Sequence, residues 1–167
     1  LYKIASFDIV NHQLLRAVAK TGKPVIMSVG MSNLDEIEDA YNILKEGTDC
    51  IAILHCISSY PTIEKDSKLS NIYKIQEKYN CIIGQSDHSN DIKVPIYAAA
   101  AGAQILEKHF KIDNNFECVD APVSITEVQM KKLVEEVRGL EVIFGKENFG
   151  IRSSEEQTAV FRRLIKD

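Results

Sequence analysis

Two histidines follow the fourth and fifth apolar runs of the chain, His88 within SDH and His109 within EKHF. If those runs are neighbouring strands of one sheet, they lie about 4.8 Å apart. Two imidazoles placed so could share a divalent metal ion, with Asp87 and Glu107 near enough to orient a ligand or a water molecule. The alternative is that both histidines are hydrogen-bonded polar residues at strand ends, and spacing alone leaves both interpretations open.

Hydroxyl side chains and one lysine accompany the other apolar runs. The serines are Ser6, Ser28, Ser58, Ser59 and Ser86. Lys3 alternates along the first run, and if it points inward it is a cation that needs an anionic partner. A ring of hydroxyls with one ammonium suits a phosphate or carboxylate ligand. Serines are also common in turns, so a purely structural role stays open at this point.

Other candidates carry weaker signals. His55 directly precedes Cys56, but adjacent residues of a strand point to opposite faces, so we expect no Cys–His nucleophile pair and a structural role for Cys56. His12 is expected to face solvent. Lys108 could serve a Schiff-base aldolase as an alternative chemistry. Asp120 lies in a loop four residues before Ser124, which opens a predicted capping box and leaves Asp120 free for function.

The elements that must position these residues repeat a simple unit. Apolar runs at residues 2–5, 25–28, 50–56, 81–86 and 103–110 are each followed by a helical stretch. The second helix shows Ile37, Tyr41 and Leu44 on one face, and a capping box at residues 32–35 begins it. Apolar strands that alternate with amphipathic helices predict a parallel sheet with helices packed on it.

Two α/β architectures compete for this pattern, a doubly wound sheet and a (β/α)8 TIM barrel. No GxGxxG follows an early strand, which disfavours a dinucleotide-binding fold. Polar residues at the carboxyl ends of all five strands favour the barrel, whose active sites are assembled there. A barrel needs eight units and about 250 residues. The sequence therefore predicts an incomplete (β/α)8 TIM barrel with about five strand–helix units.

The bulk composition is that of a single globular domain of 167 residues. A formal net charge of −4 argues against a nucleic-acid partner. No apolar run reaches the roughly 20 residues that span a bilayer, and the opening residues do not resemble a signal peptide. Four widely spaced cysteines predict no disulfide framework and a reducing cytoplasm.

Six motifs together resemble the N-acetylneuraminate (sialic acid) synthase family, which includes related nonulosonic-acid and spore-coat polysaccharide synthases. They occur in the family's order and cover essentially the whole chain: KIASFD (Lys3–Asp8), PVIMSVGMS (Pro24–Ser32), LHCISSYP (Leu54–Pro61), GQSDHS (Gly84–Ser89), EKHF (Glu107–Phe110) and VDAPVSI (Val119–Ile125). The resemblance implies a phosphoenolpyruvate-dependent condensation with an N-acylated amino sugar such as N-acetylmannosamine, with release of phosphate.

The resemblance also implies roles for individual residues. His88 and His109 would hold a divalent Mn or Mg ion, which polarises the aldehyde oxygen of the sugar, and Glu107 would stand beside the metal as a catalytic group. The implied phosphoenolpyruvate contacts are Lys3, Ser6, Ser28, Ser58 and Ser86, and those to the sugar are Tyr60 and Asp120.

Departures from the family pattern limit this transfer. Asp8 replaces a common Glu, and VDAPVS replaces the commoner PDHxFS, which puts the identity of the acceptor sugar in doubt. The resemblance assigns residues 1–150 to the C-terminal part of the synthase barrel. It assigns residues 151–167 to a connector toward a C-terminal antifreeze-like domain, with a homodimer expected for the full-length protein. The alternative is an inactive barrel fragment that binds or self-associates through its open sheet edges.

Overall fold

Five parallel strands form the centre of the molecule in a computed structural model that describes residues 1–163. The strands follow one another in the sheet in chain order: β1 (Tyr2–Ile4), β2 (Val25–Ser28), β3 (Ile51–Cys56), β4 (Ile82–Asp87) and β5 (Ile105–Lys108). Every connection is a crossover, because parallel neighbours cannot be joined by a tight hairpin. β1 and β5 are the two edges of this sheet.

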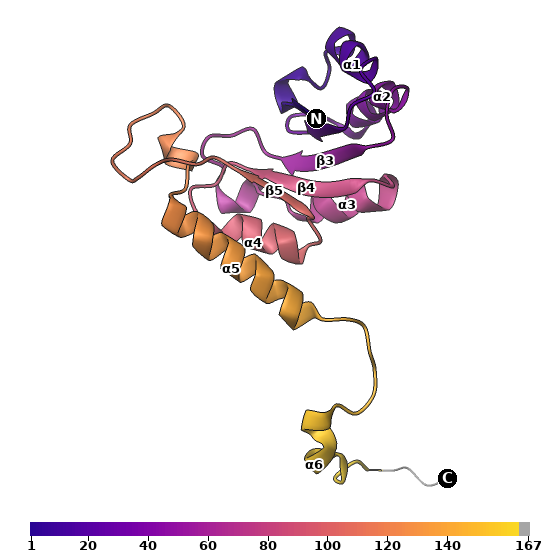
Figure 1. The fold of residues 1–167 in the computed structure, drawn as a ribbon, viewed down its shortest axis with the longest axis vertical. Coiled ribbons are helices and arrows are strands. Elements are labelled where there is room, and N and C mark those ends of the chain that lie inside the picture. Colours follow the sequence, from indigo (N-terminus) through magenta and orange to yellow (C-terminus); the bar gives the residue numbers. More distant parts are fainter. Residues whose placement is uncertain (164–167) are drawn as a thin grey trace.

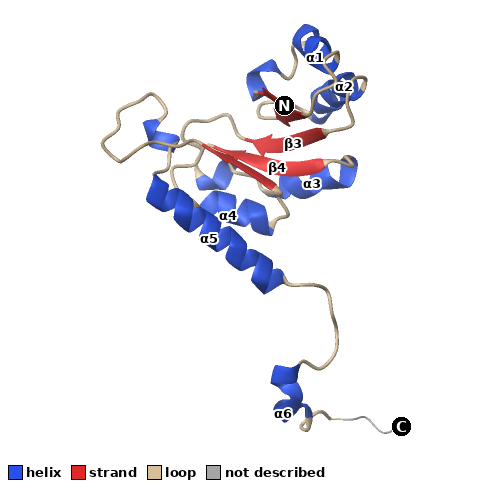
Figure 2. Ribbon diagram, viewed as in Figure 1, coloured by secondary structure: helices blue, strands red, loops and turns tan. Residues whose placement is uncertain are grey.

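Four helices connect the strands and pack on the sheet (Figures 1 and 2): α1 (His12–Ala19), α2 (Leu34–Lys45), α3 (Ser70–Lys78) and α4 (Lys93–Ala100). After β5, α5 (Glu127–Phe144) packs beside α4, and the short α6 (Glu156–Ala159) lies away from the sheet. Short 3-10 turns cover Ser6–Asp8, Glu64–Asp66, Ala121–Val123 and Ser153–Glu155. The α/β prediction and the strand–helix alternation are therefore confirmed as five parallel strands of a half-barrel. The full number of barrel units stays a prediction.

The two faces of the sheet differ in what covers them. Met27, Ile53 and Ile83 occupy paired positions of three strands and point toward the helices. They are at most 1 % exposed and belong to the main core. We call this side the outer face. The other side, the inner face, carries small and apolar residues such as Ala52 and Gly84 in the middle of the strands, followed by polar residues at their carboxyl ends. Strand alternation thus decides which polar side chains meet in a site.

Helix starts differ from the predicted capping boxes by one or two residues. α2 begins after Asn33, whose side chain accepts hydrogen bonds from the Asp35 and Glu36 amides while the Glu36 carboxylate accepts one from the Asn33 amide. α5 likewise uses Thr126 and Gln129. The predicted starts at Ser32 and Ser124 are wrong. The residue three positions after Ser32 is Asp35, which is shorter than the Glu36 that reaches back to Asn33. After Ser124, the Ile125 amide and carbonyl are bonded to the His109 carbonyl and the Lys111 amide, so α5 cannot begin before Thr126.

The C-terminal part of the chain leaves the body of the fold after α5 (Figure 1). A segment without regular structure leads to the last 3-10 turn and α6, and Phe149 in it is 97 % exposed. The predicted connector at 151–167 falls here, and its last four residues, 164–167, lie outside the described part. Within residues 1–163, no helix combines the length and the apolar character that crossing a membrane requires. All four cysteines are free.

Candidate functional site

A hollow opens on the inner face at the carboxyl ends of the strands. Nine of the ten site residues predicted from the sequence line it: Lys3, Ser6, Ser28, Ser58, Tyr60, Ser86, His88, Glu107 and His109. Ala5, Phe7 and Cys56 complete the lining. Side chains from all five strands and the loops that follow them therefore meet at one place, although 106 residues of chain separate Lys3 from His109.

One end of the hollow is a network of an ammonium, a carboxylate and two hydroxyls. Lys3 Nζ donates to Ser28 Oγ at 2.9 Å and lies 3.6 Å from Glu107 Oε1. Ser86 Oγ donates to Glu107 Oε1 at 2.7 Å. The Lys3 and Glu107 side chains remain 34 % and 42 % exposed. Lys3 thus points into the hollow, which meets the condition for an anion site, and its partly exposed side chain remains open to an anionic ligand.

The other end holds the two histidines, with ring centroids 5.2 Å apart. His88 Nδ1 donates a hydrogen bond to the Ile57 carbonyl at 2.9 Å. That bond occupies Nδ1 and does not involve Nε2. His109 Nδ1 lies 3.6 Å from Asp120 Oδ2. Asp120, the tenth predicted residue, is thus placed behind His109 rather than in the lining of the hollow. An Nδ1 directed at an oxygen is the usual arrangement of a histidine that binds metal through Nε2.

Backbone hydrogen bonds tie two loops to these histidines. The Thr62 amide donates to the His88 carbonyl at 2.9 Å, and the Ile125 amide donates to the His109 carbonyl at the same distance. The first bond brings Tyr60 over the site, where its ring lies 4.1 Å from that of His88 and 5.8 Å from that of His109. The loops that carry Tyr60 and Asp120 are therefore positioned through the histidines' own backbone.

The two imidazoles titrate differently. Burial lowers the pKa of His109, and the neighbouring His88 lowers it further. Burial also opposes charge on His88, but its contacts with Cys56 and the Ile57 carbonyl raise its pKa overall. His109 is therefore neutral at pH 7 and keeps a nitrogen lone pair for a ligand.

The sequence did not predict two residues at or beside the hollow. Cys56 was expected to be structural; it is buried in the lining, with Sγ 3.8 Å from both His88 Nδ1 and Ser58 Oγ. Gly30 lies behind the lining serines: its amide donates to Ser6 Oγ at 2.9 Å, and a Cβ there would come within 2.4 Å of Ser58 Oγ. A glycine between Ser28 and Ser32 was the available signal, because close backbone approach is a usual reason for glycine.

Asp87 and Lys108 do not belong to this hollow, which corrects the expectation for Asp87 and bears on the alternative chemistry named for Lys108. Both side chains alternate to the outer face, where Lys108 Nζ and Asp87 Oδ2 form an ion pair at 2.7 Å. The two side chains are 1 % and 2 % exposed. Asp87 therefore cannot orient a ligand or a water molecule between the histidines. Lys108 is paired with Asp87 and closed off from substrate, which argues against the Schiff-base alternative.

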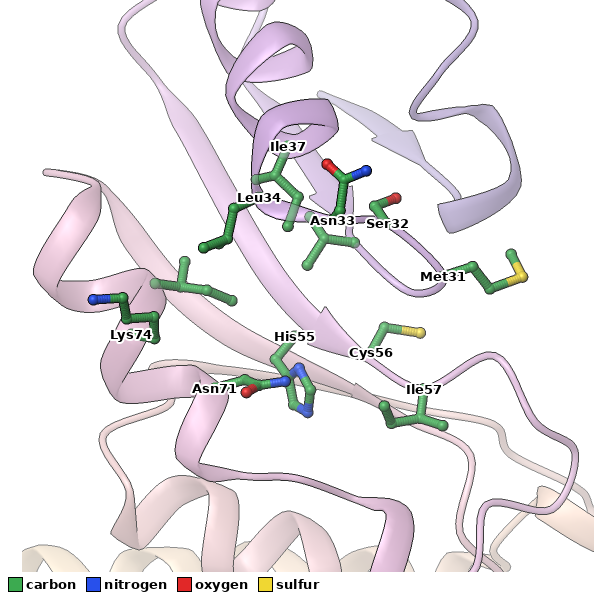
Figure 3. A pocket seen from close by; sticks show the side chains of 12 residues that line it. Met31, Ser32, Asn33, Leu34, Ile37, His55, Cys56, Ile57, Asn71 and Lys74 are labelled. Carbon is green, nitrogen blue, oxygen red and sulfur yellow. The ribbon is translucent and has the colours of Figure 1, made fainter.

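His55 lies on the outer face as well, beside a cavity between α2 and α3 (Figure 3). Its Nε2 and the Ser67 carbonyl are 2.7 Å apart, and burial lowers its pKa. Figure 3 shows the imidazole next to Asn71 and directed away from the Cys56 thiol. The expectation that His55 and Cys56 form no nucleophile pair agrees with this geometry, and His12 is exposed as predicted.

The residues that could hold a metal ion are few. Within residues 1–163 there is no cluster of three or more His, Cys, Asp or Glu side chains arranged for an ion. His88 and His109 supply two imidazoles from neighbouring strands, with one Nδ1 bonded to a carbonyl. The donor set fits a cation that takes most of its ligands from water and substrate, as catalytic ions with open positions do.

Comparisons with known proteins agree with the motifs. The chain is 35 % identical over 165 residues to the pseudaminic acid synthase of Campylobacter jejuni, covering 98 % of this chain and 48 % of that protein. It is 34 % identical over 148 residues to the N,N'-diacetyllegionaminic acid synthase of the same species, covering 87 % and 44 %. The crystal structure of N-acetylneuraminic acid (sialic acid) synthetase from Leptospira borgpetersenii superposes with a TM-score of 0.89 at 40 % identity, covering 96 % of this chain and 56 % of that one.

These comparisons also define the extent of the match. The chain spans about half the length of the relatives it resembles. The NeuB family matches residues 1–149, which include every strand and every residue of the hollow. The resemblance drawn from six short motifs is thereby confirmed: the chain belongs to the NeuB family of sialic acid synthases.

Proposed function

We propose that this chain forms the C-terminal part of the catalytic barrel of a phosphoenolpyruvate-dependent synthase. The whole protein would condense phosphoenolpyruvate with an N-acylated amino sugar to a sialic or related nonulosonic acid and release phosphate. One observation carries the proposal: Lys3, Ser28, Ser86, Glu107 and the two histidines line a single hollow. NeuB family membership supports it, and the inactive-fragment alternative gains no support from the relatives.

The Lys3 end of the hollow suits phosphoenolpyruvate. Its ammonium and the hydroxyls of Ser6, Ser28, Ser58 and Ser86 can neutralise and orient a phosphate and a carboxylate with charge-assisted hydrogen bonds. Ser28 already accepts a bond from Lys3, so the group is organised before a ligand arrives. Preorganised donors of this kind stabilise developing charge without reorganisation.

Glu107 is the acidic residue of the lining, flanked by Lys3 and Ser86. A carboxylate so close to an anion-binding ammonium would repel the ligand unless its own charge is partly neutralised, and Lys3 and Ser86 both contribute to that. We propose that Glu107 orients the water that adds to the enol-ether carbon. This role needs an exposed carboxylate, and 42 % of the side chain is accessible.

The histidine end suits a divalent Mn or Mg ion held by His88 and His109. Such an ion supplies Lewis acidity, which polarises the aldehyde oxygen of the acceptor. The protein's contribution is orientation: the Ile57 carbonyl fixes the His88 ring, and the Asp120 carboxylate stands behind His109. The low pKa of His109 favours the neutral form that a ligand must have.

Tyr60 and Asp120 stand beside the histidines, where we place the acceptor sugar. The Tyr60 ring lies against that of His88, and the Asp120 side chain is half-exposed. The relatives are named for three different sugar acids, which supports an N-acylated amino sugar as the class of acceptor.

We further propose that the whole protein completes an eight-unit barrel beside the two sheet edges and works as a homodimer. The relatives are about twice as long as this chain, and unpaired strand edges such as β1 and β5 are normally covered in a native protein. Residues 151–167 would connect the barrel to a further domain. The cytoplasmic compartment stays a prediction from the sequence.

The direct test is phosphate release by the whole protein. Phosphoenolpyruvate is incubated with Mn²⁺ and either N-acetylmannosamine or a panel of di-N-acylated hexoses, and phosphate and sugar acid are quantified. We expect equal amounts of both with one acceptor, and loss of turnover when a chelator is added. Phosphate release without any acceptor, or turnover unaffected by the chelator, would contradict the proposal.

A further inference from the structure

A buried ion pair lies directly behind the histidine pair, on the outer face of the sheet. Lys108 Nζ and Asp87 Oδ2 are 2.7 Å apart. The register of β4 and β5 places Asp87 opposite Lys108, and the next residue in each strand is a histidine, His88 or His109. The two strand ends are therefore joined one residue before each imidazole, on the opposite side of the sheet.

Both members of the pair make further hydrogen bonds. Asp87 accepts hydrogen bonds from the Ser89 hydroxyl at 2.6 Å, the Ser89 amide at 3.2 Å and Gln85 Nε2 at 3.3 Å. Lys108 also donates to the Ser89 carbonyl. The network therefore fixes the turn after His88 as well as the two strands. It brackets His88 on both sides, through Asp87 and Ser89.

Stability alone does not account for this pair. Desolvating two charges is costly, and well-packed apolar replacements of a buried ion pair are often as stable or more so. Every other ion pair among residues 1–163 has both side chains at least 30 % exposed. The one buried pair thus stands where two strands must be held in exact register behind a shared site.

We infer that Asp87 and Lys108 are positioning residues, which lock β4 against β5 so that His88 and His109 face a common ligand. The role toward a metal ion rests on the proposed function. The placement of the two imidazole rings, with centroids 5.2 Å apart, depends on the ion pair whether or not a metal binds. Neither residue lines the hollow, so any effect on ligand binding must pass through their neighbours in the two strands, which are Ser86 and Glu107 on one side and the two histidines on the other.

The test uses the double variant Asp87→Asn/Lys108→Met in the whole protein, because it leaves no unpaired buried charge. Two properties are measured: proton–proton contacts between the imidazoles in metal-free, histidine-labelled protein by NMR, and Mn²⁺ affinity by electron paramagnetic resonance. The matched control is Glu64→Gln/Lys93→Met, which removes an exposed ion pair between two elements. Circular dichroism verifies that each variant is folded.

We expect the double variant to lose the ring-to-ring contacts and to bind Mn²⁺ about tenfold to a hundredfold more weakly, the range typical for residues that orient a ligand. The control should match the wild type. A folded double variant with wild-type contacts and wild-type affinity would overturn the inference.

Two further outcomes are separable. If the wild type binds no Mn²⁺, the metal part of the proposed function fails, and the ring contacts alone decide the inference. If the double variant does not fold, Asp87→Glu replaces it, because that change keeps both charges and lengthens one side chain by a methylene. We expect Asp87→Glu to weaken the ring contacts, and unchanged contacts would overturn the inference equally.

Discussion

Two lysine–carboxylate pairs lie on opposite faces of the same sheet, and they differ in almost everything except composition. On the inner face, Lys3 and Glu107 are 3.6 Å apart and more than a third exposed. On the outer face, Lys108 and Asp87 are 2.7 Å apart and at most 2 % exposed. Glu107 and Lys108 are neighbours in β5. One step along β5 therefore leads from the Glu107 carboxylate, which a ligand can reach, to the Lys108 ammonium, which is buried on the opposite face.

The difference shows that environment, rather than residue type, assigns the role. The inner pair is loose, shares its bonds with Ser28 and Ser86, and leaves room for a competing anion. The outer pair makes further hydrogen bonds with Ser89 and Gln85 and is almost fully buried. We therefore expect inner-face changes to alter binding and outer-face changes to alter folding and alignment.

The largest expected effect on stability comes from removing one partner of the outer pair. Lys108→Ala leaves the Asp87 carboxylate buried without its counter-ion, which typically costs about 3–5 kcal/mol. Lys3→Ala removes a half-exposed partner and should cost less than about 1 kcal/mol after solvent screening. Denaturant unfolding followed by circular dichroism measures both. Equal losses for the two variants would remove the distinction between the faces.

The inner pair should dominate binding instead. Lys3→Met removes the ammonium from the hollow, and a hydrogen bond from a charged group contributes about 1.5–3 kcal/mol, so phosphoenolpyruvate affinity should fall about tenfold to a hundredfold. Isothermal titration calorimetry on the whole protein checks this. The control is Lys74→Met, an exposed lysine on α3 away from the hollow. A similar loss for both lysines would point to a general electrostatic effect.

A smaller effect on the same face is expected at Gly30. Gly30→Ala introduces a Cβ within 2.4 Å of Ser58 Oγ and 2.9 Å of Ser6 Oγ. Both hydroxyls must move, so we expect phosphoenolpyruvate affinity to fall about tenfold, the value of one hydrogen bond at the upper end of the range for neutral groups. Gly139→Ala on α5 meets nothing within 4 Å and should raise stability by about 0.5–1 kcal/mol. Calorimetry and unfolding curves separate the two; unchanged affinity for Gly30→Ala would exclude these serines from the site.

The smallest effect is a pH dependence of stability, with opposite signs for His55 and His88; inner-face His109, whose pKa is also lowered, acts in the same sense as His55. Burial lowers the pKa of outer-face His55, so the unfolded chain takes up a proton first as the pH falls. This contribution is full above about pH 6.5 and is lost below it. The raised pKa of inner-face His88 works in the other sense, and its contribution is lost as the pH rises above about 6.5.

Unfolding midpoints at several pH values test the sign. His55→Gln should make the fall in stability between about pH 6.5 and 5 shallower, because the titrating group is gone while an amide can still donate to the Ser67 carbonyl. His12→Gln is the matched control, since His12 is exposed. A profile that His55→Gln leaves unchanged would assign the acid sensitivity to other groups.

Much of the fold and most of the site could be predicted, because alternation and strand order are properties of the sequence. Lys3, Ser28, Ser86 and Glu107 were each at the carboxyl end of a strand, and a parallel sheet brings such ends together. The roles of Asp87 and Lys108 were harder to predict, since they depend on which face of the sheet each side chain points to. A polar residue at a strand end looks the same in the sequence whether it faces the hollow or the helices.

The remaining differences have equally local causes. Cys56 is buried, as is usual for a free cysteine, but its place beside His88 depends on the arrangement of neighbouring strands and could not be read from the sequence. The helix starts were displaced because serine is a good cap in isolation. Glu36 selects Asn33 over Ser32, and the pairing of Ile125 with the His109 carbonyl keeps α5 from beginning at Ser124.

The most direct measurement of the central claim uses the four histidines of the chain, two on the inner face and two elsewhere. Mn²⁺ binding to the whole protein is titrated by electron paramagnetic resonance for His88→Ala, His109→Ala, His55→Gln and His12→Ala. We predict that the first two variants lose at least about a hundredfold in affinity, the upper end for changes near a metal site, and that the last two bind as the wild type does. Wild-type affinity in His88→Ala and His109→Ala would contradict the assignment of the inner face as the functional site.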